Sequence, residues 1–94
     1  MVNTAIKGRR GEHRARKILE AAGYLVTRAA GSKGPADLIA WNTVQFRFIS
    51  VKSGTKYASA LEREALKGMP APPNATKEIW RLPDRCKEPL IEVL

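Results

Sequence analysis

The stretch of sequence that decides the fold is residues 35–53, which read PADLIAWNTVQFRFISVKS. Residues 36–41 and 46–52 are rich in the branched and aromatic residues that strands favour. Residues 42–45 between them have a length that suits the turn of a hairpin. The stretch therefore predicts two neighbouring strands that pair in the antiparallel direction.

The second of these strands places its polar side chains on one face. Successive side chains of a strand point to opposite faces, so Ser50 and Lys52 share one face while Ile49 and Val51 share the other. Asp37 opens the neighbouring strand. We therefore expect an aspartate and a lysine to meet at one end of a small sheet.

A helix is predicted upstream, over residues 9–22. Its apolar residues recur at three- and four-residue spacing, which is typical of an amphipathic helix, and Gly23 follows as a stop. These apolar residues are Ala15, Ile18, Leu19 and Ala22. Glu12 lies beside Leu19 on a helical wheel, at the margin of the apolar stripe. We therefore expect Glu12 to face the protein and to join the aspartate and the lysine.

Further elements complete the pattern. A strand precedes the loop of residues 29–35, which contains Gly31 and Gly34. A second helix ends at Gly68, and a proline-rich segment separates this helix from the last two strands. These elements span residues 24–28, 58–67, 78–82 and 90–94, and the proline-rich segment spans 69–74. The order α-β-β-β-α-β-β predicts an α+β fold around one sheet, in a single domain of residues 1–94.

The chain is strongly basic. Its 94 residues include 17 Lys and Arg against 9 Asp and Glu, a net charge of +8. Eight basic but only two acidic side chains fall within residues 1–33. An anionic partner such as nucleic acid or a membrane surface is the first expectation. With one Cys and one His, an internal disulfide and a structural zinc site built from Cys and His are excluded.

Nothing in the sequence indicates a membrane protein or a secreted one. No apolar run approaches the roughly 20 residues that a membrane span needs. Residues 1–11 contain no apolar stretch suited to a signal peptide. We therefore predict a cytoplasmic protein.

Two carboxylates and an amine in a basic protein suggest a metal-dependent phosphodiesterase. Mg²⁺ prefers hard oxygen ligands, usually one or two carboxylates completed by water and phosphate oxygens, and it stabilises charge that develops on the phosphate. A lysine can orient the attacking water and offset the added negative charge. Glu12, Asp37 and Lys52 are therefore candidate catalytic residues.

These residues belong to an ordered set of motifs that resembles the PD-(D/E)XK nucleases, and within them the archaeal and viral Holliday junction resolvases. The motifs are Gly11-Glu12, Gly23-Tyr24 with Val26 and Arg28, Ala30-Gly31-Ser32, Pro35-Ala36-Asp37-Leu38-Ile39-Ala40 and Ile49-Ser50-Val51-Lys52-Ser53. The resemblance covers residues 8–54, and the remainder matches only in element order. It implies a restriction-endonuclease-like α/β core, with a mixed central sheet flanked by helices.

The resemblance implies a Mg²⁺-dependent endonuclease, with Mn²⁺ as an alternative metal, that acts on four-way or other branched DNA as a symmetric homodimer. By position, Asp37 and Glu12 would bind the metal, Lys52 would be the motif lysine, and the backbone carbonyl of Val51 would be a further ligand. The exposed end of the sheet and residues 41–48 are candidates for the dimer contact. Two other functions stay open: a nuclease-fold protein that binds DNA without cutting it, and a phage-type nuclease acting on duplex or single-stranded DNA.

Ser50 departs from the family motif, which has Asp or Glu at this position of the metal site. A hydroxyl is a poorer, uncharged ligand. Some restriction endonucleases with Ser-Val-Lys at this place supply the missing carboxylate from the following helix, on which Glu62 and Glu64 lie here. Glu64, twelve residues after Lys52, is closer to that spacing and is the hypothesised catalytic replacement.

A DNA-binding surface is predicted along the first helix and the loop after the first strand. Basic side chains concentrate there beyond what solubility requires, which favours contacts with phosphates. Arg28 and Ser32 also match resolvase residues near the scissile phosphate. The predicted nucleic-acid-binding residues are Arg9, Arg10, Arg14, Arg28, Ser32, Lys33 and Lys56. Gly8 and Gly11 each weaken a helix by about 1 kcal/mol relative to Ala, so a close approach to DNA or to a partner subunit is expected there.

Each candidate residue also has a purely structural interpretation. Asp37 could bond its own turn, Lys52 could face solvent from a strand, and Glu12 could be a first-turn glutamate that the helix dipole favours. For these three residues the catalytic interpretation is preferred. For Glu62 and Glu64 the preferred interpretation is a solvated helix face.

Overall fold

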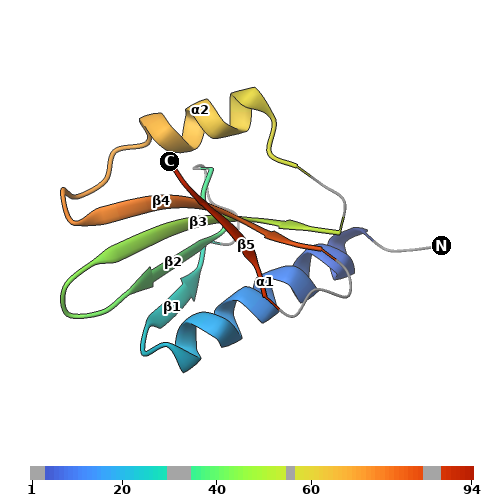
Figure 1. Ribbon diagram of the computed structural model, residues 1–94, viewed down its shortest axis with the longest axis horizontal. Coiled ribbons are helices and arrows are strands. Elements are labelled where there is room, and N and C mark those ends of the chain that lie inside the picture. The colour runs from blue at the N-terminus through green and yellow to red at the C-terminus, as the bar shows by residue number, and fades with distance from the viewer. Residues whose placement is uncertain (1–3, 30–34, 55–56, 84–87) are drawn as a thin grey trace.

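The computed structural model describes residues 4–29, 35–54, 57–83 and 88–94, with side chains from residue 10 onward in the first helix. These residues form two helices and five strands in the predicted α-β-β-β-α-β-β order (Figure 1). The elements are α1 Thr4–Ala21, β1 Leu25–Arg28, β2 Leu38–Trp41, β3 Phe46–Ser53, α2 Ala60–Gly68, β4 Ala75–Leu82 and β5 Leu90–Val93. The predicted α+β fold class is confirmed.

The strands form one mixed sheet in the order β1-β2-β3-β4-β5. The predicted hairpin is confirmed, because β2 and β3 pair antiparallel with Leu38 opposite Ile49 and Trp41 opposite Phe46. β3 and β4 pair in parallel, with α2 in the connection between them. In Figure 1, α1 and α2 lie along opposite sides of the sheet.

α1 covers one face of the sheet. Ala15 and Leu19 are buried against Leu38 and Trp80 in the larger hydrophobic core. Burial of a Leu side chain stabilises the fold by about 1.5–3 kcal/mol, so the apolar stripe fixes the side that the helix turns to the sheet. Glu12 precedes Ala15 by three positions and Leu19 by seven, and therefore lies on that side of the helix.

The end of α1 confirms Gly23 as a stop. Gly23 has φ of 94°, which a residue with a Cβ rarely adopts. Its N–H donates to the Glu20 carbonyl at 3.0 Å, and the Tyr24 N–H donates to the Leu19 carbonyl at 3.0 Å. This is the Schellman pattern of helix ends. The start of the helix was predicted less well, because α1 begins at Thr4 and runs through both of its glycines.

Gly11 is explained by a contact inside the chain. A Cβ at this position would overlap the Ser53 hydroxyl and would lie 3.5 Å from a Val51 methyl group. The expected approach to DNA or to a partner subunit is therefore wrong for Gly11, whose close neighbour is β3. The surroundings of Gly8 are outside the described part of the chain. The tight contact at Gly11 brings the next residue, Glu12, to the end of β3.

α2 covers the opposite face and begins with a capping box. The Glu62 N–H donates to Ser59 Oγ at 3.1 Å, and the Ser59 N–H donates to Glu62 Oε1 at 3.4 Å. Leu66 is buried with Ile79 and Ala36 in a second, smaller core. The cap and this core together fix the position of Glu62 over the sheet.

The parallel β3–β4 ladder contains a buried ion pair. Arg47 of β3 donates to both carboxylate oxygens of Glu78 of β4, at 2.8 and 2.6 Å. Trp80 Nε1 donates to Glu78 Oε1 at 2.9 Å, and Thr76 also donates to this carboxylate. Glu78 is 2% exposed, yet each of its oxygens is hydrogen-bonded. β4 begins at Ala75, three residues before the predicted start, because residues 75–77 pair with the first residues of β3.

None of the helices in the described residues has the length and apolar character needed to cross a bilayer. The cytoplasmic location stays a prediction.

Candidate active site

Asp37 lies where β3 extends past the start of β2. Its backbone N–H donates to the Ile49 carbonyl at 2.8 Å, and its Oδ2 accepts a hydrogen bond from the Val51 N–H at 2.7 Å. Both contacts tie the aspartate to β3. The N–H and C=O of one strand residue point to the same neighbour, so the Val51 carbonyl also faces the Asp37 side.

Asp37 interacts electrostatically with the other acidic and basic candidates. Burial raises the pKa of Asp37 above its ordinary value, while the hydrogen bond from Val51 opposes this rise. The charges of Glu12 and Glu62 raise the pKa of Asp37 further, and the charge of Lys52 lowers it. Such effects require proximity. The fold therefore brings Glu12, Asp37 and Lys52 together as the sequence predicts, and it adds Glu62.

Glu62, and not Glu64, is the α2 residue that contacts Lys52. The hydrogen bond from Lys52 lowers the pKa of the Glu62 carboxyl. Both glutamates are exposed, but Glu64 lies two positions further along the helix, which corresponds to a rotation of about 200° away from Glu62. The structure therefore brings Glu62 to the motif lysine, and a catalytic role for Glu64 stays a prediction.

Ser50 occupies the second acidic position of the motif and is 7% exposed. It shares the face of Lys52, as strand alternation predicts. Within the described residues, no three His, Cys, Asp or Glu side chains gather closely enough to hold a metal ion by themselves. A cation at this site would therefore depend on two carboxylates, a backbone carbonyl, and oxygens from water or substrate.

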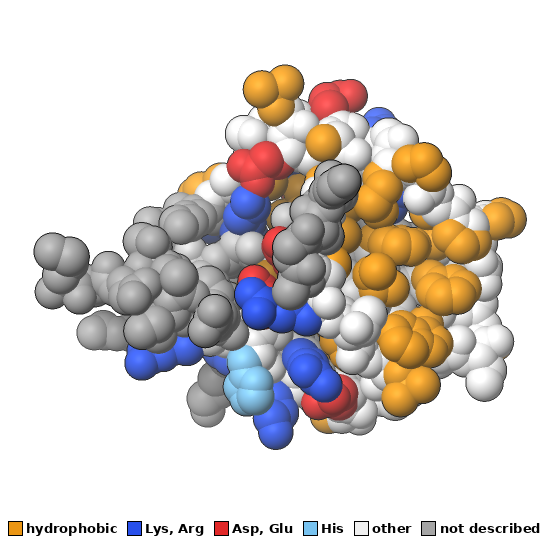
Figure 2. Space-filling model, turned by 180° about the vertical axis from the view of Figure 1, so that it is seen from behind, with side chains coloured by type: hydrophobic (Ala, Val, Ile, Leu, Met, Phe, Trp, Pro, Cys, Tyr) orange, Lys and Arg blue, Asp and Glu red, His pale blue; other side chains and the backbone are white. Residues whose placement is uncertain are grey.

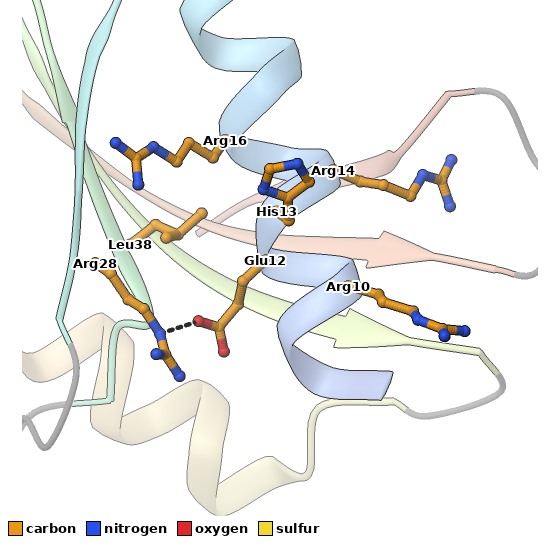
Figure 3. Close-up of a pocket in the computed structure, with 7 residues that line it drawn as sticks. All are labelled: Arg10, Glu12, His13, Arg14, Arg16, Arg28 and Leu38. Atoms are coloured by element: carbon orange, nitrogen blue, oxygen red, sulfur yellow. Dashed lines mark hydrogen bonds and ion pairs between the residues drawn. The ribbon is translucent and has the colours of Figure 1, made fainter. Parts of the chain in front are cut away.

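Glu12 and Arg28 connect α1 to the end of β1. Arg28 Nε donates to Glu12 Oε1 at 2.7 Å. The Glu12 side chain is 20% exposed, which confirms that it faces the protein, whereas that of Arg28 is 46% exposed. In Figure 3 the two side chains point toward one another across the space between α1 and β1. The exposed guanidinium of Arg28 is therefore adjacent to a candidate metal ligand.

A surface cavity of about 720 Å³ surrounds this ion pair. Its lining includes the arginines Arg10, Arg14, Arg16 and Arg28, together with His13. Figure 2 shows Lys, Arg and His side chains gathered on one half of the molecule and hydrophobic side chains on the other. Guanidinium groups bind phosphates with directed hydrogen bonds. Three predicted DNA-binding residues thus line one cavity, and helical periodicity could also have indicated Arg16, which sequence reasoning did not select.

Some predicted DNA contacts fall outside the described part of the chain. They are the Arg9 side chain, Ser32, Lys33 and Lys56. Their contacts with DNA stay predictions.

Tyr57 and Arg81 lie near the site and were not expected there. The Arg81 Cζ atom is 3.7 Å from the centre of the Tyr57 ring. In the parallel register of β3 and β4, Arg81 pairs with Lys52. No local sequence signal marks Arg81, because its position depends on the pairing of distant strands.

Comparison with known proteins identifies the family. The family model described as archaeal Holliday junction resolvase (Hjc) matches residues 3–71. Among solved structures, Hjc of Archaeoglobus fulgidus, a Holliday junction resolvase from an archaeal hyperthermophile, is similar with a TM-score of 0.74. The two are 25% identical, and the match covers 94% of this chain and 71% of that one. No curated protein matches the sequence significantly.

The matched region contains α1, the hairpin and the residues gathered around Asp37. The agreement in fold extends beyond it to nearly the whole chain. The resemblance drawn from the motifs is thereby confirmed. The chain belongs to the archaeal Holliday junction resolvase family of PD-(D/E)XK nucleases, which makes it a structure-selective nuclease of DNA junctions.

Proposed function

We propose that this chain cleaves four-way DNA junctions in a reaction that depends on Mg²⁺, with Mn²⁺ as an alternative. The observation that supports the proposal most is the position of Asp37. Its carboxylate is held by the Val51 N–H and shares its electrostatic neighbourhood with Glu12, Lys52 and Glu62. Family membership supports the junction as substrate.

The metal would be held by the carboxylates of Asp37 and Glu12 and by the Val51 carbonyl. These donors fit Mg²⁺, because all of them are hard oxygens. The charge of Glu12 also raises the pKa of Asp37, which means that the two carboxylates repel each other and that a cation bound between them would be favoured. The Ser50 hydroxyl would add only a neutral oxygen. When bound, the cation offsets charge on the scissile phosphate and activates the attacking water.

We assign Lys52 the task of orienting that water and stabilising negative charge. Glu62 would hold the ammonium group in position through its ion pair. The capping box fixes Glu62 at the first turn of α2, so the pair does not depend on a flexible segment. Glu62 thereby takes the place proposed for Glu64 as the α2 carboxylate at the site, but it acts on Lys52 and does not replace the metal ligand missing at Ser50.

The cationic cavity would bind phosphates of the junction arms. Arg10, Arg14 and Arg28 line it, beside the proposed metal ligands. The net charge of +8 supports an extended contact with nucleic acid. The remaining predicted DNA contacts, at Arg9, Ser32, Lys33 and Lys56, belong to the same proposal.

A symmetric homodimer would supply the two sites that paired cuts across a four-way junction need. An apolar sheet face supports this assembly. It lies on the side of β1–β3 away from α1 and consists of Leu25, Ile39, Trp41, Phe46 and Phe48, the last of which also packs against the smaller core under α2. Leu25 is 63% exposed and the other four are half-buried. Clustered apolar side chains at a surface mark protein interfaces.

The test is cleavage of a labelled four-way junction, compared with a linear duplex and a single strand of the same sequence. We expect symmetric nicks in the junction alone, dependent on Mg²⁺ and lost with Asp37→Asn. Equal cleavage of duplex or single strands would instead indicate the phage-type activity. Sedimentation of the protein with and without the junction checks the dimer.

A second candidate function is DNA binding without cleavage. The buried Ser50 favours it, since the motif carboxylate is absent at that position. Tight binding of the junction with no cleavage in Mg²⁺ or Mn²⁺ would support this alternative, and Ser50→Glu would then be the change to restore activity.

A further inference from the structure

Tyr57 is a large aromatic residue that the fold leaves open to solvent. It lies between β3 and α2, and 68% of it is exposed. One face of its ring stacks on the Arg81 guanidinium, whose Cζ is 3.7 Å from the ring centre. The exposure of Tyr57 is too high for a core residue, so its ring surface is available to a partner outside the chain.

Arg81 is placed to hold this ring in position. Its Nε is buried and, among the described residues, has no hydrogen-bond partner. A cation over an aromatic face is attracted to the ring, and the attraction grows when the cation is partly shielded from water. The stack therefore orders a side chain that would otherwise rotate freely at the surface.

The stack lies beside the proposed catalytic residues. Arg81 pairs with Lys52 in the parallel β3–β4 register, so their backbones are about 5 Å apart and their side chains share one face. Lys52 contacts Glu62 on that face. The exposed ring is thus one strand away from the lysine that the proposed function places at the scissile phosphate.

We propose that Tyr57 is a stacking platform for a DNA base at the branch point of the junction, and that Arg81 is its positioning residue. This inference rests on the proposed function. Where a four-way junction opens at its centre, the bases at the branch point lack a stacking neighbour, and an aromatic ring can replace that neighbour whatever the base. Selection of branched over linear DNA then follows from geometry, because only the branch offers an unstacked base next to the scissile phosphate.

The test measures junction affinity in EDTA, which prevents metal-dependent cleavage. Tyr57→Leu removes the aromatic face, and Tyr57→Phe keeps it. We expect Tyr57→Leu to weaken junction binding about 5- to 150-fold, the range of one base–aromatic stack, with duplex binding unchanged. Tyr57→Phe should bind like the native protein. Val93→Ala is the matched control, because Val93 is 62% exposed but lies on β5, at an edge of the sheet.

A second substrate separates stacking from a structural role. In a junction with abasic nucleotides at the branch point, the native protein and Tyr57→Leu should bind equally, since no base remains to stack. Arg81→Met should reproduce part of the Tyr57→Leu loss on the intact junction and none on the abasic one. A thermal melt of each variant confirms that it is folded.

The outcomes distinguish the inference from the proposed function. A native protein that prefers and cleaves the junction, with Tyr57→Leu unchanged or equally weakened on intact and abasic junctions, overturns the stacking role alone. A native protein that neither prefers nor cleaves the junction overturns the proposed function, and the stacking role with it.

Discussion

The Glu62 carboxylate at the first turn of α2 contacts the Lys52 ammonium of β3. The contact connects the helix to the strand that carries the nuclease motif. It places a carboxylate beside the motif lysine in a chain that has Ser50 where the family motif has an acid. The capping box of α2 and the burial of Leu66 hold Glu62 in place. The contact therefore does not depend on the long Lys52 side chain alone.

Glu62→Gln should reduce the rate of junction cleavage about 10- to 100-fold, as is common for residues that orient a catalytic or metal-binding group. The amide removes the charge that holds the lysine but keeps the size of the side chain. Single-turnover cleavage in Mg²⁺ measures the effect. Glu64→Gln is the matched control and should cleave at the native rate. Equal cleavage rates for the two variants would show that Glu62 has no role in the reaction.

Arg28→Ala should lower junction affinity and make it less dependent on salt. Each cation that neutralises a phosphate releases a counterion, so the slope of log K against log[salt] should fall in magnitude by about 1. Arg63→Ala is the comparison and should leave the slope unchanged, because Arg63 is likewise paired with a glutamate, Glu92, but lies on α2 and does not line the cavity. A slope unchanged by Arg28→Ala would show that this guanidinium makes no phosphate contact.

The Arg47–Glu78 pair should make stability depend on pH. Burial raises the pKa of Glu78, but the hydrogen bonds from Arg47, Thr76 and Trp80 outweigh it and leave this pKa below its ordinary value of 4.5. A lowered pKa means that the charged pair stabilises the fold above about pH 4.5, and that this stabilisation is lost as pH falls through the folded-state pKa. Thermal melts between pH 7 and pH 3 should show the loss.

Glu78→Gln should flatten that pH dependence. It should also lower the free energy of unfolding at pH 7 by about 3 kcal/mol, because it leaves a partly buried Arg47 without its charged partner. Glu20→Gln removes an exposed pair with Arg16 and should change stability by less than about 1 kcal/mol. If the two variants lost similar free energies of unfolding, the buried pair would contribute no more to stability than the exposed one.

Gly11→Ala should destabilise the protein by up to about 2 kcal/mol, although alanine is the better helix former. The new Cβ would overlap the Ser53 hydroxyl, and forced repacking costs about 1–3 kcal/mol, against about 1 kcal/mol gained in helix propensity. Ser53→Ala should be nearly neutral, since its buried hydroxyl has no hydrogen-bond partner among the described residues.

The double variant Gly11→Ala with Ser53→Ala should recover most of the stability lost by Gly11→Ala. Chemical denaturation of the four proteins gives the coupling free energy directly. A coupling close to zero would show that the helix and β3 are not in tight contact at this point.

The sequence by itself determined the local elements and the identity of the motif. The stripe of α1, its stop at Gly23 and the β2–β3 hairpin follow from periodicity and turn chemistry within short stretches, and all three are present in the structure. Asp37 directly precedes β2 and Lys52 lies on β3, so their proximity was predictable from the hairpin as well.

The tertiary structure decided the relationships between distant elements. The choice of Glu62 over Glu64 depends on the rotation of α2, which its cap and the burial of Leu66 set. The neighbourhood of Lys52, Arg81 and Tyr57 depends on the parallel β3–β4 register. Local patterns describe which face of an element is apolar, whereas the orientation of one element against another depends on packing between residues far apart in the chain.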